Sequence, residues 1–109
     1  MIHVLAVITA KPGLRDTILT HFRANVPAVK AEQGCIEYGA AIDAENAPAI
    51  QTPWGPDTFV VIEKWESMDA LKAHSTAPHM AAYAAKTGRQ LFLRDGVLNG
   101  TNPVDVSSR

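Results

Sequence analysis

Residues 63–80, EKWESMDALKAHSTAPHM, hold the clearest junction between a strand and a helix in this sequence. The alternation of residues that ends at Trp65 predicts a buried strand. Ser67 can cap a following helix with its hydroxyl, and Asp69 adds an acid to the positively polarised first turn. Pro78 predicts the end of that helix and the first position of another. Strand and helices together bring an acid, an indole and imidazoles to one region, as a small pocket requires.

Size and composition place the chain among ordinary globular proteins. It has 109 residues, 47% hydrophobic and 19% charged, which suits a single domain. A net charge of -1 leaves no basic excess for nucleic acid. The lone Cys35 excludes an intramolecular disulfide and fits a reducing compartment. The apolar run over residues 1–10 has no preceding Lys or Arg and is too short to span a bilayer, so we expect a cytoplasmic protein without membrane contact.

Periodicity predicts the remaining elements. The segment from Ile2 to Thr9 is rich in β-branched residues and apolar on both faces, which predicts a strand covered on both sides. The hydrophobic stripe from Leu14 to Val29 predicts an amphipathic helix, in which Pro27 is expected to cause a kink or an early end. The same reasoning predicts strands at Cys35–Ile42, Thr58–Trp65 and Arg89–Leu98 and a helix at Pro78–Lys86, with Cys35 and Tyr38 on opposite faces of their strand.

The order strand, helix, strand, strand, helix, strand predicts an α+β fold of the ferredoxin-like βαββαβ type. Its four-stranded antiparallel sheet would carry helices on one face. We expect this domain to span residues 1–98 and residues 99–109 to form a loosely held polar C-terminal tail. The other sheet face needs cover that a chain of this length lacks. Two subunits stacking their sheets would supply it, so we expect a homodimer through the sheet face.

The segment over residues 43–57 is a long loop with three prolines and Trp54. Fifteen residues without regular structure are unusual in a small domain and are often functional when ordered. Trp54 could be a lid over a cavity, an anchor on a partner subunit, or a hydrophobic plug that holds the loop down.

Several short motifs, taken in order, resemble one known family. Residues 32–38, EQGCIEY, are followed by 63–67, EKWES, then by Leu71, His74 and Pro78-His79. Their order and spacing are similar to those of the antibiotic biosynthesis monooxygenase (ABM) family, in particular its small quinol-monooxygenase-like members, over residues 1 to about 98. The resemblance implies a dimeric α+β barrel with a pocket between sheet and helices. It also implies oxygenation of a phenolic ring without metal or flavin.

The haem-cleaving branch of that family does not fit. Members of that branch resemble one another in three positions: Asn in the first strand, Trp near the position of His74, and His about ten residues further on. Here the first strand has no Asn, His occupies position 74, and Ala84 follows at the second position. All three positions depart, so we do not expect haem cleavage.

Oxygenation without a cofactor needs a base, a donor for the developing oxyanion and a dry aromatic slot. His74 is the candidate base or proton shuttle because an imidazole titrates near neutral pH. Glu63 shares a strand face with Trp65 and could orient His74, so Glu63 and His74 are the candidate catalytic residues. The candidate substrate-binding residues are Trp65, His79, Met80, Tyr83 and Trp54.

Simpler explanations exist for each of these residues. His74 could cap the end of its own helix, where a cation interacts well with the helix dipole. Trp65 could be a core or dimer residue, and Glu63 could pair with Arg89 or Arg94. A metal site of His74, His79 and Glu63 is not expected, because a spacing of five across a proline puts no two ligands on one helical turn.

The sequence therefore predicts a cofactor-independent monooxygenase that oxidises a quinol or polyphenolic aromatic with molecular oxygen as co-substrate. Two alternatives stay open on the same dimeric scaffold. One is an isomerase of a small metabolite that uses Glu63 and His74 as acid and base without oxygen. The other is a non-enzymatic ligand-binding or stress-response module.

Overall fold

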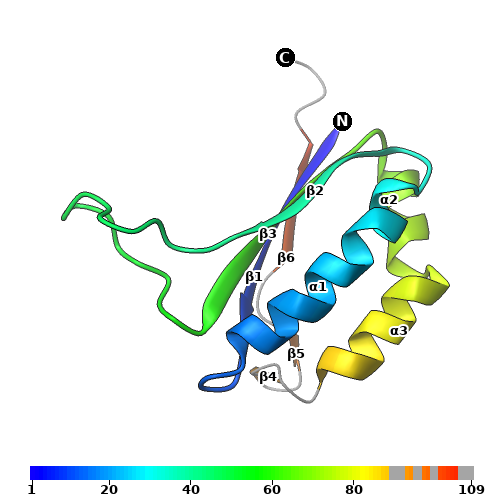
Figure 1. The fold of residues 1–109 in the computed structure, drawn as a ribbon. Helices are drawn as coiled ribbons and strands as arrows, with labels where there is room; N and C mark the ends of the chain where they lie inside the picture. The colour runs from blue at the N-terminus through cyan, green and yellow to red at the C-terminus, as the bar shows by residue number, and fades with distance from the viewer. Residues whose placement is uncertain (89–92, 95–96, 99–100, 106–109) are drawn as a thin grey trace.

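The computed structural model of the chain describes residues 1–88, 93–94, 97–98 and 101–105. Figure 1 shows the helices packed against one face of a twisted sheet, with the opposite face left open. The elements in chain order are β1 (Ile2–Thr9), α1 (Arg15–Lys30), β2 (Cys35–Ala41), β3 (Thr58–Trp65), α2 (Met68–Ser75), α3 (Pro78–Thr87), β4 (Leu93–Arg94), β5 (Val97–Leu98) and β6 (Thr101–Asp105).

The main sheet has the strand order β2-β3-β1-β6, and its neighbouring strands are antiparallel. β1 and β3 form its centre, with Ile2 opposite Trp65 and Thr9 opposite Thr58. Both strands were predicted with these bounds. The element order and sheet topology confirm an α+β fold of the ferredoxin-like type.

The strand beside β1 is not the one predicted. A strand was expected at Arg89–Leu98, but the described parts of that segment, β4 and β5, pair with each other in a separate two-stranded sheet. β6, which lies in the expected tail, pairs with β1 instead. Pro103 stands within β6, and proline is tolerated there because an edge strand needs no hydrogen-bond donor on its outer side. Residues 89–92 and 95–96 of the predicted strand lie outside the described part.

The second strand contains an irregularity that changes its faces. Cys35 pairs with Trp65, but the register shifts before Glu37, and Tyr38 then pairs with Glu63. A bulge adds one residue to one strand, so side chains three apart come to the same face. Cys35 and Tyr38 therefore both pack against the core, and their predicted placement on opposite faces was wrong.

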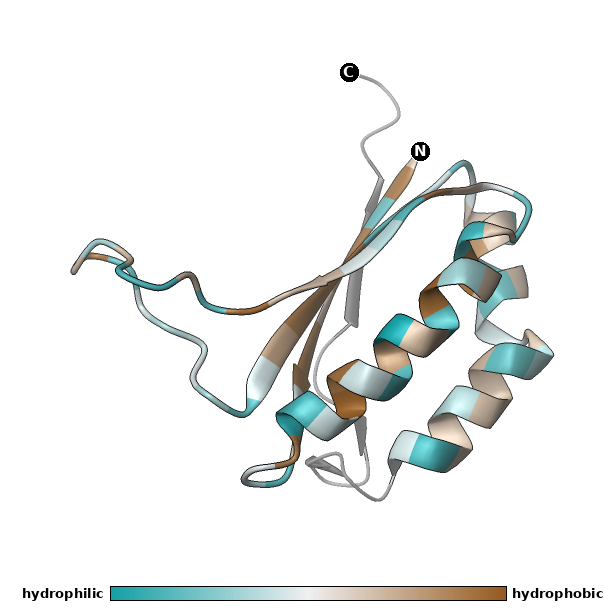
Figure 2. Ribbon diagram, viewed as in Figure 1, coloured by the Kyte–Doolittle hydropathy of each residue, from teal (hydrophilic) through white to brown (hydrophobic). Residues whose placement is uncertain are grey.

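The core lies between the helices and the inner sheet face. Figure 2 shows apolar residues along β1 and β3 and in bands on α1. Phe22 of α1 stacks on Tyr38 and meets Phe59 edge to face. α1 continues to Lys30, three residues beyond Pro27, so the predicted early end of the helix did not occur. On the outer sheet face Leu5 remains 53% exposed.

None of the helices in the described ranges is both long and apolar enough to cross a membrane.

Candidate functional site

The acid and the indole of β3 point toward the helices. Glu63 and Trp65 are both buried, with only 7% and 0% of their surface exposed. The Trp65 indole Nε1 donates a hydrogen bond of 2.9 Å to Glu63 Oε1. A buried carboxylate needs such a donor because it has lost its water. The predicted shared face of Glu63 and Trp65 is therefore the inner face of the sheet.

α2 carries His74 over these two side chains. The Ser67 hydroxyl accepts a hydrogen bond of 3.1 Å from the Ala70 amide, which confirms the predicted helix cap. His74 lies in the last turn and is 5% exposed. Its ring centroid lies 4.6 Å from that of Trp65 and 5.5 Å from that of Tyr38, which it meets in an edge-to-face arrangement. The imidazole is thus held among aromatic rings rather than on the helix surface.

A second acidic residue, Glu32, lies in the turn after α1. Gly34 has a left-handed φ of 85°, and its carbonyl accepts a hydrogen bond of 2.8 Å from the Glu66 amide. A Cβ at Gly34 would lie 2.6 Å from the Cβ of Ala70. The turn is therefore fastened tightly against the junction of β3 and α2, which brings the Glu32 side chain close to His74.

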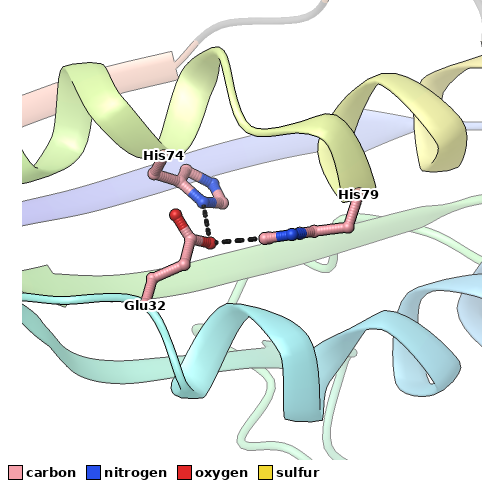
Figure 3. Close-up of side chains that lie close together, drawn as sticks. All are labelled: Glu32, His74 and His79. Carbon is pink, nitrogen blue, oxygen red and sulfur yellow. Dashed lines mark hydrogen bonds and ion pairs between the residues drawn. The ribbon is translucent and has the colours of Figure 1, made fainter.

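The Glu32 carboxylate joins two imidazoles. Its Oε2 lies 2.8 Å from His74 Nδ1 and 2.9 Å from His79 Nε2 (Figure 3). An ionised carboxylate only accepts, so each of these nitrogens carries the proton that it donates. The other nitrogen of His74, Nε2, faces Glu63 Oε1 at 3.9 Å. His74 therefore lies between two carboxylates, with Glu32 in hydrogen-bond contact and Glu63 just beyond it.

Burial changes the pKa values of the titratable groups in this cluster. Burial raises the pKa of Glu63, and the Trp65 hydrogen bond and the nearby His74 offset the rise only in part. Burial also raises the pKa of Tyr38, and the charge of Glu63 adds to that rise. A proton accepted here would be stabilised by carboxylates that little water screens.

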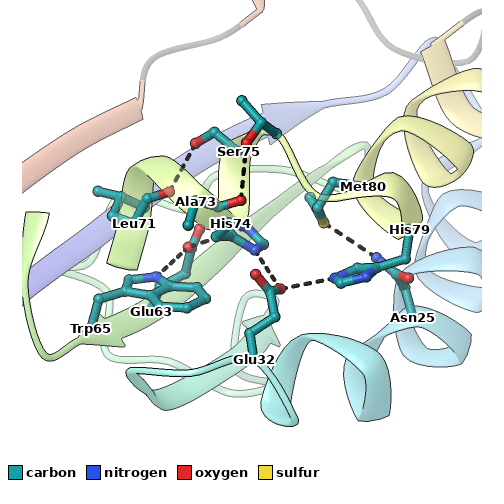
Figure 4. Close-up of polar contacts among 11 residues, drawn as sticks. Asn25, Glu32, Glu63, Trp65, Leu71, Ala73, His74, Ser75, His79 and Met80 are labelled. Carbon is teal, nitrogen blue, oxygen red and sulfur yellow. Dashed lines mark hydrogen bonds and ion pairs between the residues drawn. The ribbon is translucent and has the colours of Figure 1, made fainter. Parts of the chain in front are cut away.

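Pro78 begins α3 and places His79 in its first turn, as predicted. The His79 side chain is 28% exposed and lies at a cleft of about 210 Å³ between α1 and α3. Met80 packs on the core, and its sulfur lies 3.3 Å from Asn25 Nδ2 (Figure 4). The cleft is lined by His21, Ala24, Asn25, His79, Ala82, Tyr83 and Lys86.

The structure brings together most of the predicted site residues. Glu63, Trp65, His74 and His79 form one contiguous cluster, and Met80 and Tyr83 lie beside it. Trp65 is fully buried and contacts His74 instead of open space. Burial raises the pKa of Tyr83 to about 12, so its hydroxyl stays protonated at neutral pH.

Trp54 is the exception among the predicted residues. It belongs to the loop between β2 and β3, which extends away from the body of the molecule in Figure 1. Its side chain is 59% exposed, and its amide donates to Asp43 Oδ1 at 2.9 Å. Within one protomer Trp54 is therefore not a wall of the cluster, and it does not fill the pocket as a plug.

Two residues that contact His74 were not among the predicted site residues. Glu32 was quoted only as part of a motif, although an acid two residues before a glycine that ends a helix is a usable signal. Tyr38 was assigned to the wrong face of the sheet because the alternation of residues along the sequence gives no sign of the bulge. Arg89 and the side chain of Arg94, considered as partners of Glu63, lie outside what the structure describes.

Comparison with known proteins agrees with this fold. The family model described as antibiotic biosynthesis monooxygenase matches residues 1–86. The chain belongs to this family. It is 40% identical over 86 residues to YgiN of Escherichia coli strain K12, named as a probable quinol monooxygenase, and the match covers 77% of this chain and 82% of YgiN.

Solved structures show the same fold as this family member. One is a crystal structure titled as an antibiotic biosynthesis monooxygenase, with a TM-score of 0.76 and 23% identity over 97% of this chain and 98% of that one. Rv0793 of Mycobacterium tuberculosis gives a TM-score of 0.75 and 21% identity, over 99% of this chain and 96% of that one. At these identities the similarity concerns the fold alone.

Proposed function

We propose that the protein is a cofactor-independent monooxygenase that oxidises a small quinol or polyphenolic aromatic with molecular oxygen. The observation that carries the proposal is the chain of hydrogen bonds His79–Glu32–His74, which runs from a surface cleft to a buried aromatic cluster. Family membership and the name of the relative YgiN support the reaction class.

The reaction asks little of the protein beyond proton transfer. Removing a phenolic proton makes the ring electron-rich, and the anion then reacts with oxygen directly. One oxygen atom enters the ring and the other leaves as water, so a quinol becomes a hydroxyquinone without an external reductant. The protein must accept the proton and keep the anion away from bulk water.

The cluster suits the proton transfer. We propose that the substrate lies in the cleft beside His79 and that the chain His79–Glu32–His74 takes up its proton on a ring nitrogen that does not face Glu32. Glu32 and Glu63 then stabilise the imidazolium that forms. The Tyr83 hydroxyl, which stays protonated, is the proposed donor to the oxyanion. A cleft of about 210 Å³ is small for a binding site and favours a substrate of one or two rings.

The proposed assembly is a homodimer through the outer sheet face. Leu5 is 53% exposed there and Ile36 is 48% exposed. The β2–β3 loop adds Ile50 and Trp54, which are 89% and 59% exposed. Apolar side chains exposed in this way mark interaction surfaces. We propose that two sheets stack as a barrel and that the partner subunit covers Trp54.

Oxygen uptake with a panel of reduced naphthoquinols and smaller polyphenols tests the proposed reaction. We expect the chelator-treated protein to consume oxygen above the rate of autoxidation with at least one compound. Uptake should fall at least 100-fold in His74→Ala, since a positioned acid–base group contributes that much or more. Rates equal to autoxidation across the whole panel would contradict the proposal.

The same acid–base chain also suits isomerisation of a small metabolite, in which a proton leaves one carbon and returns to another. This second candidate needs no oxygen. Turnover of a substrate under anaerobic conditions, abolished in Glu32→Gln, would favour the isomerase over the monooxygenase.

A further inference from the structure

We propose that Glu32, His74 and His79 form a binding site for a divalent transition metal of the Zn²⁺ type. Binding there would occupy His74 Nδ1 and break the hydrogen-bonded chain. The metal is therefore proposed as an inhibitor rather than a cofactor. That consequence rests on the proposed function, whereas the binding itself does not.

The donor set carries the first part of the argument. Two imidazole nitrogens and one carboxylate oxygen converge, and no two of these three atoms are more than 4.8 Å apart. Two histidines and a glutamate are a known ligand set for zinc that leaves a position open to water. Nitrogen ligands favour Zn²⁺, Co²⁺ and Ni²⁺ over Mg²⁺ and Ca²⁺, which take oxygen ligands.

The distances show what binding would change. Glu32 Oε2 is 2.8 Å from His74 Nδ1 and 2.9 Å from His79 Nε2. Around zinc with bonds of 2.0–2.1 Å, neighbouring tetrahedral ligand atoms lie about 3.3 Å apart. The oxygen must therefore withdraw by about half an ångström while the two nitrogens turn toward the ion. We expect small rotations of the three side chains to supply these shifts.

Glu63 supplies the second part of the argument. A metal on His74 Nδ1 requires the proton of the neutral ring to sit on Nε2. That nitrogen faces Glu63 Oε1 at 3.9 Å, and Glu63 is itself held by Trp65. A metal-bound histidine commonly donates its other N–H to a carboxylate, which fixes the ring and strengthens the ligand. The metal would displace the proton that Nδ1 donates to Glu32, and the buried carboxylate of Glu63 is placed to accept the proton that then sits on Nε2.

The surroundings of the three ligands give a metal ion access to the site and balance its charge. His79 is 28% exposed at the cleft between α1 and α3, which opens a path for an ion and for its water ligand. Glu32 and Glu63 together balance the two positive charges of the metal. The spacing of His74 and His79 gave no sign of such a site, because the third ligand comes from a segment 42 residues before His74.

Calorimetric titration of the chelator-treated full chain with Zn²⁺ tests the binding. We expect one ion to bind per chain. With Co²⁺ in place of Zn²⁺, we expect the protein to show the visible absorption bands of a low-symmetry, protein-bound cobalt ion. Glu32→Gln and His79→Ala should each weaken binding at least tenfold. Glu63→Gln should weaken it by about 10- to 100-fold through the lost second carboxylate. His3→Ala, which removes a histidine of β1, should bind as the wild type does.

The result that would overturn the site is Zn²⁺ affinity unchanged in both Glu32→Gln and His79→Ala, in variants whose circular dichroism shows an intact fold. Affinity lost in His21→Ala but kept in Glu32→Gln would place the ion in the cleft and would also overturn it. Equal affinity for Mg²⁺ would exclude the nitrogen ligands. Calorimetry needs no substrate, so a failure of the proposed oxidation leaves this test intact, and Zn²⁺ inhibition of oxygen uptake is measured separately.

Discussion

At the scale of single residues, His74 owes its setting to side chains from three other segments. Trp65 covers its ring, Tyr38 meets its edge, and Glu32 and Glu63 lie at its two nitrogens. A histidine that only capped its own helix would point toward solvent. His74 is instead 5% exposed and directed into the core, which favours a role in proton transfer.

The raised pKa of Glu63 leads to a prediction about stability and pH. The folded protein holds the Glu63 proton more tightly than the unfolded chain does, because burial penalises the carboxylate. This contribution to stability is fully present below the ordinary pKa of 4.5 and is lost as the pH rises through the higher folded pKa. Glu63→Gln has no such proton. The free energy of unfolding of the wild type relative to Glu63→Gln should therefore decrease as the pH rises above 4.5.

Urea denaturation of both proteins at a series of pH values measures this difference. The amide of the substituted glutamine keeps an oxygen for the Trp65 indole, so the fold should survive the change. A difference that grows with pH would mean that the folded state favours the ionised carboxylate, against the assignment made above.

At the scale of elements, the turn between α1 and β2 fixes the site. Gly34 combines a left-handed φ with close contact to α2, and both features exclude a side chain. We expect Gly34→Ala to lower the free energy of unfolding by about 2 kcal/mol or more, from backbone strain of roughly 1–2 kcal/mol and overpacking against Ala70. Chemical denaturation measures the loss.

Gly88→Ala is the matched control. Gly88 has a helical φ of -57° and open space where a Cβ would lie, so alanine there should leave stability unchanged or raise it by up to about 1 kcal/mol. Adding Ala70→Gly to Gly34→Ala should restore part of the loss. An equal effect of the two glycine substitutions would contradict the role given to the turn.

Some of the elements could be predicted from the sequence, and others could not. β1, β3 and the start of α2 follow from alternation and from the Ser67 cap, because these signals are local. The bulge in β2 shifts the faces by one residue without any change in composition. Glu32 meets His74 only through the packing of a turn on a distant helix. The pairing of β6 with β1 depends on the sheet edge, and a polar segment containing Pro103 gives no sign of it.

At the scale of the whole molecule, the outer sheet face predicts the assembly. Leu5 lies opposite Ile62 on that face and is 53% exposed. We expect the wild type to have the mass of a dimer by light scattering at micromolar concentration. Leu5→Lys should convert it to a folded monomer, because two charges would be buried without partners at a symmetric interface.

Ala85→Lys serves as the control, since it adds the same charge on the exposed side of α3. It should remain dimeric. A wild type that is monomeric at micromolar concentration, or a Leu5→Lys protein that keeps the dimer mass, would contradict the stacked sheets.

The central claim is that the metal-free protein inserts oxygen into a quinol through the His74 cluster. Its most direct test is the turnover of a reduced naphthoquinol under ¹⁸O₂ by the chelator-treated protein, with the product analysed by mass spectrometry. We predict a hydroxyquinone that carries one ¹⁸O atom, formed by the wild type at least 100-fold faster than by His74→Ala. A product without label, or labelled product formed no faster than in the absence of protein, would contradict the claim.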